Sequence, residues 1–322
     1  MMDHTMFPVR VARKTREADG IFSFEFVHVD GDWLPEFSAG AHIDVRVGHG
    51  LTRQYSLCNC PSERHRYVIA VLKEPNSRGG SVAMHDQIAE GDVIQISQPR
   101  NHFPLCSESK DSLLLAGGIG VTPILSMAEQ LASTGAQFEM HYCARSLERT
   151  AFVDRIRGSA FGDHVCFHFD DGPPDQRLDL AVLLGKPTED RHLYVCGPRG
   201  FLDAVIETAK EAGWTESNIH FEYFSAPVQV AENDGAFEVR VASSGKIVRV
   251  TADQTVISAL AGAGVDVPVS CELGVCGTCL TRVLEGVPDH RDSYLTNFER
   301  DSNHQFLPCC SRAKTPLLVL DL

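Results

Sequence analysis

The sequence predicts a multidomain protein with an antiparallel β-barrel, a doubly wound α/β domain and a small α+β domain, in that order. Its 322 residues allow two or three domains at roughly 100 to 200 residues per domain. Short strands give way to alternating strands and helices, and a polar, turn-rich stretch then precedes a hairpin and a helix. We therefore expect domains at residues 1–105, 106–226 and 236–322, with a linker at 227–235.

The first part contains short apolar runs separated by Gly, Asp, Asn or Pro, which is typical of strands. Strands at such close spacing favour a small antiparallel barrel. The expected strands are Phe7–Ala12, Ile21–Val27, His42–Val47, Gln54–Cys58, Tyr67–Leu72 and Asp92–Ser97.

The second part alternates strands with helices, the pattern of a doubly wound parallel sheet. The expected strands are Ser112–Ala116, Phe138–Cys143, Val165–Phe169 and His192–Cys196. The expected helices are Ile124–Ser133, Phe152–Ile156, Leu178–Leu184 and Gly200–Ala212. The third part begins with a hairpin, Phe237–Ala242 and Lys246–Val250, and continues with a helix at Gln254–Ala263.

Composition excludes several classes of protein. Hydrophobic residues at 43% and charged residues at 22% are typical of globular rather than disordered chains. The 43 acidic residues outnumber the 29 basic ones, so the surface would repel nucleic acid and anionic lipid, and neither is expected as a partner. We find no apolar run of the roughly 18 to 20 residues that span a bilayer and no secretory pattern, and we expect a cytoplasmic protein.

Cysteines in the third part have the spacing of an iron-sulfur site. Cys271, Cys276 and Cys279 follow the pattern C-x4-C-x2-C of plant-type [2Fe-2S] ferredoxins. Cys309 or Cys310 supplies the fourth thiolate, and Cys309 is preferred. The alternative is structural zinc, but zinc usually takes two separated cysteine pairs or Cys with His.

A glycine-rich loop in the second part predicts a nucleotide site. Residues 117–123 read Gly-Gly-Ile-Gly-Val-Thr-Pro between an expected strand and an expected helix, where backbone N–H groups can approach a pyrophosphate. Cys196 ends another expected strand at the carboxyl edge of the sheet, where ligands bind. The acidic residue expected about 20 residues beyond the glycines is missing, and Arg145 could accept a 2′-phosphate, so NADH and NADPH both stay open.

The barrel carries a second candidate phosphate site. Arg53, Tyr55 and Ser56 lie on one expected strand, and Gly79-Gly80-Ser81 opens a helical stretch. An arginine beside a glycine-rich helix start favours a phosphate, while the tyrosine ring and the serine hydroxyl suit a heterocycle.

Together these motifs resemble the phthalate dioxygenase reductase family, the class IA reductases of Rieske-type oxygenases. The resemblance covers nearly the whole chain: Arg-x-Tyr-Ser and Gly-Gly-Ser, then Gly-Gly-Ile-Gly-Val-Thr-Pro and Cys-Gly-Pro, then Cys-Gly-Thr-Cys and Cys-Ser-Arg-Ala-Lys. Asp289-His290-Arg291-Asp292 and the Cys309-Cys310 pair resemble the reductases of carnitine monooxygenase and vanillate demethylase type. The resemblance implies an FMN-binding barrel, an NAD(P)-binding α/β domain and a ferredoxin-like β-grasp domain.

The resemblance also implies roles for individual residues. The FMN phosphate would be held by Arg53, Gly79, Gly80 and Ser81, and the ring and ribityl chain by Tyr55, Ser56, Ala70 and Val71. The pyridine nucleotide would be lined by Gly118, Gly120, Thr122, Cys196, Gly197 and Pro198. Phe224 would cover the flavin, and the residues expected at the reacting atoms are Ser56, Thr122, Cys196 and Phe224. A family basic residue after the Ala-Val pair is replaced by Leu72, with Lys73 beside it.

The implied function is electron transfer from NADH, or NADPH, to a Rieske-type oxygenase component. Hydride would pass from the nicotinamide to FMN, and single electrons would then pass to the [2Fe-2S] cluster and outward. One alternative is a stand-alone flavin, ferric or ferredoxin-type NAD(P)H reductase. Another is a zinc-stabilised nucleotide-binding regulator without enzymatic activity.

Overall fold

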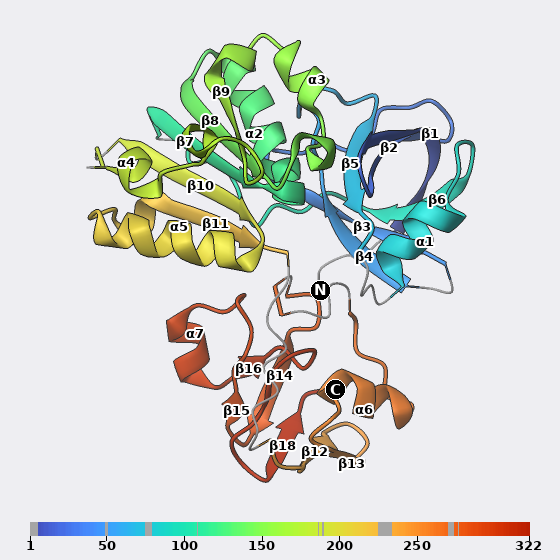
Figure 1. Ribbon diagram of the computed structural model, residues 1–322. Helices are drawn as coiled ribbons and strands as arrows, with labels where there is room; N and C mark the ends of the chain where they lie inside the picture. Colours follow the sequence, from blue (N-terminus) through green and yellow to red (C-terminus); the bar gives the residue numbers. More distant parts are fainter. Residues whose placement is uncertain are drawn as a thin grey trace. The chain divides into compact units, whose positions relative to one another are not determined.

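The computed structural model describes residues 6–48, 51–74, 79–107, 109–185, 187–188, 190–224, 234–269, 274–275 and 277–322. The chain divides into two compact units, Met1–Phe224 and Ser225–Leu322, whose helices and strands are labelled in Figure 1. Residues 227–233 of the expected linker lie outside the described residues. The boundary expected between residues 105 and 106 falls inside the first unit and stays a prediction.

The first unit begins with an antiparallel barrel, as predicted. The described strands pair in the order β4-β3-β6-β1-β2-β5. Their bounds are β1 Met6–Ala18, β2 Ile21–His28, β3 His42–Val47, β4 Leu51–Ser56, β5 Tyr67–Leu72 and β6 Val93–Ser97, and helix α1 spans Gly80–Gln87. A bridge from Leu57 to Ile69 joins the chain after β4 to β5, which brings the two edges of the sheet together.

The parallel sheet of the first unit has the doubly wound topology that the alternation predicts. Its strands are β7 Asp111–Gly117, β8 Gln137–Ala144, β9 Val165–Phe169, β10 Arg191–Gly197 and β11 Ile219–Tyr223, in the order β11-β10-β7-β8-β9. The α-helices are α2 Val121–Thr134, α3 Val153–Arg157, α4 Leu180–Leu184 and α5 Arg199–Glu211. Short 3-10 helices are η1 Gly118–Gly120, η2 Leu147–Arg149, η3 Gly162–His164, η4 Pro174–Gln176 and η5 Glu216–Asn218.

The barrel and the parallel sheet share one hydrophobic core. On β5, Ile69 and Val71 face the barrel interior, whereas Val68 and Ala70 belong to a cluster that also contains Leu125 of α2. This division follows from the alternation of side chains along a strand. A hydrogen bond adds to the apolar contact: Ser126 Oγ donates to the carbonyl of Asn59 at 3.0 Å. The two halves are therefore held together firmly enough to build one site between them.

The second unit is a small α+β fold built around a mixed sheet. Its described strands pair in the order β13-β12-β18-β14-β16, with β12 and β18 parallel and the other pairs antiparallel, and β15 pairs with β17. The strands are β12 Phe237–Val241, β13 Ile247–Val250, β14 Thr281–Glu285, β15 Pro288–Asp289, β16 Gln305–Phe306, β17 Arg312–Ala313 and β18 Leu317–Leu320. The helices are α6 Val256–Gly262 and α7 Asn297–Ser302. The predicted fold class, a barrel, a doubly wound sheet and a ferredoxin-like domain, is confirmed.

Most expected elements lie close to their predicted positions, and the differences have physical causes. The expected strand Gln54–Cys58 begins earlier and ends at Ser56, because Leu57 and Cys58 leave the ladder to bond to the chains beside them. Strand β1 runs on to Ala18 through two register shifts, which the sequence pattern conceals. Strand β11 was not predicted, because its segment mixes charged, aromatic and histidine residues without clear alternation.

Candidate functional site

Arg53 lies across the beginning of helix α1, where a phosphate is expected. A Cβ atom added to Gly80 would lie 2.5 Å from Arg53 Cγ and 2.8 Å from its Nε, so only glycine leaves room for this side chain. Gly79 precedes the helix with φ of 91°, which favours glycine. The first N–H groups of a helix have no partner within it and favour anions. The predicted residues Arg53, Gly79 and Gly80 are thus brought together in an arrangement that fits the FMN phosphate.

Ser81 and Lys73 connect this helix to the end of β5. The hydroxyl of Ser81 accepts from the backbone N–H of Glu74 at 3.2 Å. Lys73 Nζ donates to the Asp86 carboxylate of α1 at 2.6 Å. Ser81 therefore lies beside the other predicted phosphate residues, and the lysine next to Leu72 is engaged by a carboxylate.

The residues expected along the flavin ring lie on β4 and β5. The side chain of Tyr55 packs against the barrel core, and burial raises the pKa of its phenol, so the group stays neutral. Ser56, the next residue, is buried on the other face of the strand, as alternation requires. Ala70 belongs to the core shared with the parallel sheet. The side chain of Val71 is 1% exposed inside the barrel and its carbonyl accepts from His85 Nε2 at 2.8 Å, so Val71 is the least accessible of the predicted ring residues.

The glycine loop after β7 lies directly on the end of β10. A Cβ atom on Gly120 would lie 2.3 Å from the carbonyl oxygen of Cys196 and 2.5 Å from the backbone nitrogen of Gly197. A Cβ atom on Gly197 would lie 2.9 Å from the Cα atom of Gly117. Adjacent strands and the absence of side chains therefore bring the two predicted nucleotide segments together.

The remaining predicted nucleotide residues surround this contact. Gly118 has φ of 52° and open space where a Cβ atom would be. Thr122 is buried in the first turn of α2 and donates to the carbonyl of Ile119 at 3.1 Å. Pro198 precedes α5, so the N-termini of α2 and α5 both lie at the carboxyl edge of the sheet. Two helix N-termini beside a glycine loop fit a pyrophosphate.

Glu222 is a functional candidate that the sequence analysis missed. It lies opposite Cys196 in the register of β10 and β11, and its carboxyl group forms a hydrogen bond with Ser56 of β4. Its Oε2 is fully covered and has no hydrogen-bond partner in the described structure. Burial raises the pKa of this carboxyl to about 8. The residue could have been found only by recognising β11 and pairing it with β10.

Ser56, Cys196 and Glu222 therefore converge from three strands at the junction of the barrel and the sheet. Burial, together with the neighbouring Glu222, raises the pKa of the Cys196 thiol well above its usual value. A neutral, fully buried thiol is a poor nucleophile and metal ligand, which favours a positioning role. Phe224 follows β11 and packs, half-buried, against the same core as Ile119 and Ala70.

The cysteines of the second unit form the candidate cluster site. Cys279 and Cys309 are buried together with Leu295 and Leu307, and side-chain hydrogen bonds join Cys309 to Cys279 and to Cys310. Cys271 and Cys276 lie outside the described residues. Among the described residues, no three His, Cys, Asp or Glu side chains are arranged to hold a metal ion. Two buried thiols in contact fit the thiolate ligands of an iron-sulfur cluster.

The segment that contains Asp289-His290-Arg291-Asp292 supports this cysteine loop. The backbone N–H of Ser293 donates to the carbonyl of Gly274 at 2.9 Å. A Cβ atom on Gly277, whose φ is 70°, would lie 2.3 Å from the ring of Tyr294. Arg291 donates to Asp234 at 2.8 Å and to Asp289 at 2.8 Å, which fixes the start of the unit to the same segment.

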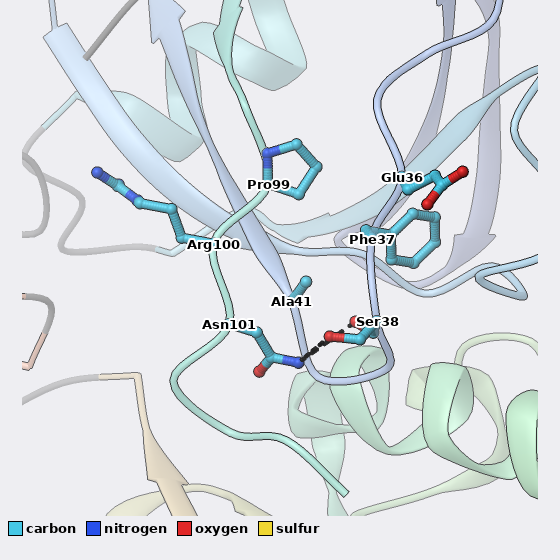
Figure 2. Close-up of a pocket in the computed structure, with 7 residues that line it drawn as sticks. All are labelled: Glu36, Phe37, Ser38, Ala41, Pro99, Arg100 and Asn101. Carbon is cyan, nitrogen blue, oxygen red and sulfur yellow. Dashed lines mark hydrogen bonds between the residues drawn. The ribbon is translucent and has the colours of Figure 1, made fainter. Parts of the chain in front are cut away.

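The hollow in Figure 2 lies elsewhere on the barrel. It has a volume of about 300 Å³ and is lined by Glu36, Phe37, Ser38, Ala41, Pro99, Arg100 and Asn101. Asn101 Nδ2 donates across it to Ser38 Oγ at 2.7 Å. Because none of the predicted site residues lines it, we assign the hollow no part in the reaction.

Comparisons with known proteins agree on one family. Residues 239–314 match the model for the 2Fe-2S iron-sulfur cluster binding domain. The chain is 54% identical over 317 residues to vanillate O-demethylase oxidoreductase from Pseudomonas sp. (strain HR199 / DSM 7063), covering 98% of this chain and 100% of that protein. It is 41% identical over 315 residues to phthalate dioxygenase reductase from Burkholderia cepacia, covering 98% and 97%.

A solved structure supports the same relationship. It is a phthalate dioxygenase reductase, described as a modular structure for electron transfer from pyridine nucleotides to [2Fe-2S], with a TM-score of 0.79 and 40% identity over 98% of each chain.

Within the described residues, none of the helices has the length and apolar composition needed to cross a membrane.

Proposed function

Since the chain belongs to the phthalate dioxygenase reductase family, we propose that it is the reductase component of a two-component Rieske-type oxygenase. As a member of this family it is an oxidoreductase whose cofactors are FMN, NADH and a [2Fe-2S] cluster. The observation that carries the proposal is the junction of Ser56, Cys196 and Glu222. There, strand β4 of the barrel, which carries predicted flavin residues, meets the carboxyl edge of the parallel sheet, which carries predicted nucleotide residues.

When bound, FMN and the cluster supply the conversion of a two-electron donor into single-electron steps. The residues of the chain bind and orient these groups. Arg53 and the start of α1 would hold the FMN phosphate, and Tyr55 and Ala70 would contact the flavin. Gly120 and Thr122 position the nucleotide, since a misplacement of about 1 Å can cost about a hundredfold in rate.

Glu222 and Ser56 hold a proton at the junction. Because the pKa of the buried carboxyl is about 8, Glu222 is protonated near neutral pH and carries no charge. Its carboxyl group forms a hydrogen bond with Ser56, the residue whose hydroxyl the family resemblance assigns to the flavin. Cys196 packs beside them as a neutral thiol, and Phe224 excludes water from the same side of the core.

The proposed partner is an oxygenase component of Rieske type in the cytoplasm. Relatives include an oxidoreductase of vanillate O-demethylase and a reductase of phthalate dioxygenase, both named for oxygenase systems. The described cysteines form no disulfide bonds with one another, which suits a reducing compartment. The location in the cytoplasm and the Rieske nature of the partner are both parts of the proposal.

Reconstitution with a purified Rieske oxygenase component of the demethylase or ring-hydroxylating class tests the proposal. We expect product formation from NADH only when both proteins are present. Replacement Cys276→Ser should abolish product formation and cytochrome c reduction and leave NADH-ferricyanide reduction intact. If NADH is oxidised equally fast with and without the oxygenase when free flavin or ferric chelates are the acceptors, and no oxygenase yields product, the stand-alone reductase would be favoured instead.

A further inference from the structure

The cluster site contains one thiol more than four ligands require. Cys310 follows Cys309 in a turn in which the backbone N–H groups of Cys310 and Ser311 both donate to the carbonyl of Leu307, at 3.3 Å and 3.0 Å. Successive side chains of a strand point to opposite faces, but this turn lets both sulfurs lie on one side. A side-chain hydrogen bond accordingly joins Cys310 to Cys309.

Cys310 also touches the cysteine loop itself. A Cβ atom added to Gly274, which lies between Cys271 and Cys276 in the sequence, would be 2.3 Å from Cys310 Sγ. Gly274 has φ of 73°, a conformation that favours glycine in any case. The sulfur of Cys310 therefore occupies the space that a side chain at residue 274 would fill, and it lies against the loop of the predicted ligands.

The two adjacent cysteines are held differently. Cys309 is 4% exposed and packs with Leu295 and Leu307. Cys310 is half-buried, and its sulfur makes long contacts, 3.7 Å to the carbonyl of Leu307 and 3.8 Å to Ser311 Oγ. Thiols are weak hydrogen-bond donors and acceptors, so each of these two contacts is weak.

We propose that Cys310 is an exchange ligand of the [2Fe-2S] cluster, able to take the iron position of Cys309. In the exchange, the bond from iron to the Cys309 sulfur breaks and a bond to the Cys310 sulfur forms. The proton of the Cys310 thiol moves to the Cys309 sulfur, and no electron is transferred. Since the cluster takes four thiolates and Cys271, Cys276 and Cys279 supply three of them, Cys310 replaces Cys309 rather than adding to it.

The inference rests on the proposed function because it requires the cluster to be present. The consequence is that the protein retains its cluster. When the bond from iron to Cys309 opens, the thiol of Cys310, which is already in contact, can bind the iron before the cluster is lost. Alanine variants are suitable because, unlike serine, alanine has no side-chain oxygen that could itself bind iron.

The first test measures iron, acid-labile sulfide and the reduced-state EPR spectrum of Cys309→Ala, Cys310→Ala and the double variant in the full-length holoprotein. We expect Cys309→Ala to keep most of its iron with altered g values, and the double variant to lose nearly all of it. Cys310→Ala should keep its iron with the wild-type spectrum. A Cys309→Ala protein as empty as the double variant would overturn the exchange, and so would loss of iron from Cys310→Ala.

The second test does not require Cys309→Ala to fold. It follows the loss of visible absorbance when an iron chelator is added to wild-type protein, to Cys310→Ala and to Cys166→Ala, a control that removes an exposed thiol of β9. We expect Cys310→Ala to bleach several times faster than the other two. Equal rates in a cluster-loaded wild type would refute the exchange alone, whereas a wild type devoid of iron and sulfide after anaerobic reconstitution would refute the proposed function.

Discussion

The two candidate sites of this chain are built in different ways. The flavin and nucleotide site of the first unit joins residues from β4, β7, β10 and β11, which are far apart in the sequence. The cluster site of the second unit combines a short cysteine loop with one turn, Leu307–Ser311. The first site depends on two packed layers being correctly joined, and the second on local backbone turns.

Because the two sites are built differently, different substitutions should disable the reduction of the flavin and the transfer of electrons through the cluster. A side chain placed where two backbones touch in the first unit should stop the reduction of the flavin by NADH and leave the cluster in place. A side chain placed in the cysteine loop should cause loss of the cluster and leave the reduction of the flavin by NADH intact. Changes of charge should act more weakly, because they leave the backbone contacts intact.

The largest effect is expected for Gly120→Ala. The added Cβ atom would lie 2.3 Å from the carbonyl oxygen of Cys196, so the nucleotide loop must move off the end of β10. We expect NADH-ferricyanide reduction to fall by about a hundredfold, the usual cost of a misplacement of about 1 Å. Cluster absorbance should be unchanged, and so should the EPR spectrum after chemical reduction of the cluster with dithionite. Gly200→Ala, where a Cβ atom meets nothing within 4 Å, is the matched control, and wild-type rates in Gly120→Ala would contradict the assignment.

The converse separation is expected for Gly277→Ala. Its φ of 70° costs a residue with a Cβ atom about 1–2 kcal/mol, and the new atom must also displace the ring of Tyr294. We expect lower iron and sulfide content and slower cytochrome c reduction, with NADH-ferricyanide reduction retained. Gly262→Ala in α6 serves as the control because its Cβ atom meets nothing within 4 Å. Equal iron content in both variants would show that the loop tolerates a side chain.

Glu222→Gln should have a smaller effect that depends on pH. The folded-state pKa of about 8 lies above the ordinary 4.5, so wild-type stability should fall as pH rises between these values and level off above pH 8. Glutamine removes this dependence and should lower the rate of flavin reduction by about tenfold or more if the proton takes part. Calorimetry from acid to alkaline pH measures the first effect and stopped-flow kinetics the second. The control is Glu216→Gln, a carboxyl that is 89% exposed; identical pH slopes in all three proteins would refute a buried, proton-holding Glu222.

The smallest effect on electron transfer is expected for Asp234→Asn. Asp234 and Arg291 are 6% and 11% exposed, and the change removes one carboxylate from an arginine that keeps Asp289. We expect the second unit to lose about 1–3 kcal/mol of stability, with cofactor content and rates unchanged at room temperature. Chemical unfolding followed by cluster absorbance measures this loss. Asp253→Asn, with an exposed carboxyl, is the control, and equal unfolding midpoints would remove Asp234 from the stabilising contacts.

The sequence predicted the sites where the chemistry follows from local spacing. The C-x4-C-x2-C pattern and the glycine loop each lie within ten residues. Arg53 and Gly80 were predicted to lie together because an arginine and a glycine-rich helix start are both suited to hold one phosphate. The fold class followed from periodicity for the same reason. The bounds of β3 and β5 agree with the prediction because β3 alternates polar and apolar residues and β5 is an apolar run.

The sequence could not predict contacts that depend on pairing between distant strands. Glu222 is unremarkable in a mixed segment, and it gains its raised pKa only when β11 pairs with β10 and the barrel brings Ser56 to it. Arg291 and Asp234 are 57 residues apart, and their ion pair depends on the folded second unit. The roles of the predicted site residues themselves stay predictions, which the variants above address.

Electron transfer from the flavin to the cluster can be followed by anaerobic titration of the wild-type holoprotein with NADH. Visible absorbance reports the flavin and EPR reports the reduced cluster, in the same samples. We expect the EPR signal of the reduced [2Fe-2S] cluster to grow as NADH is added, and to be much weaker in Gly120→Ala at the same mixing time. Bleaching of the flavin with no cluster signal at any NADH concentration would contradict electron transfer between the two centres.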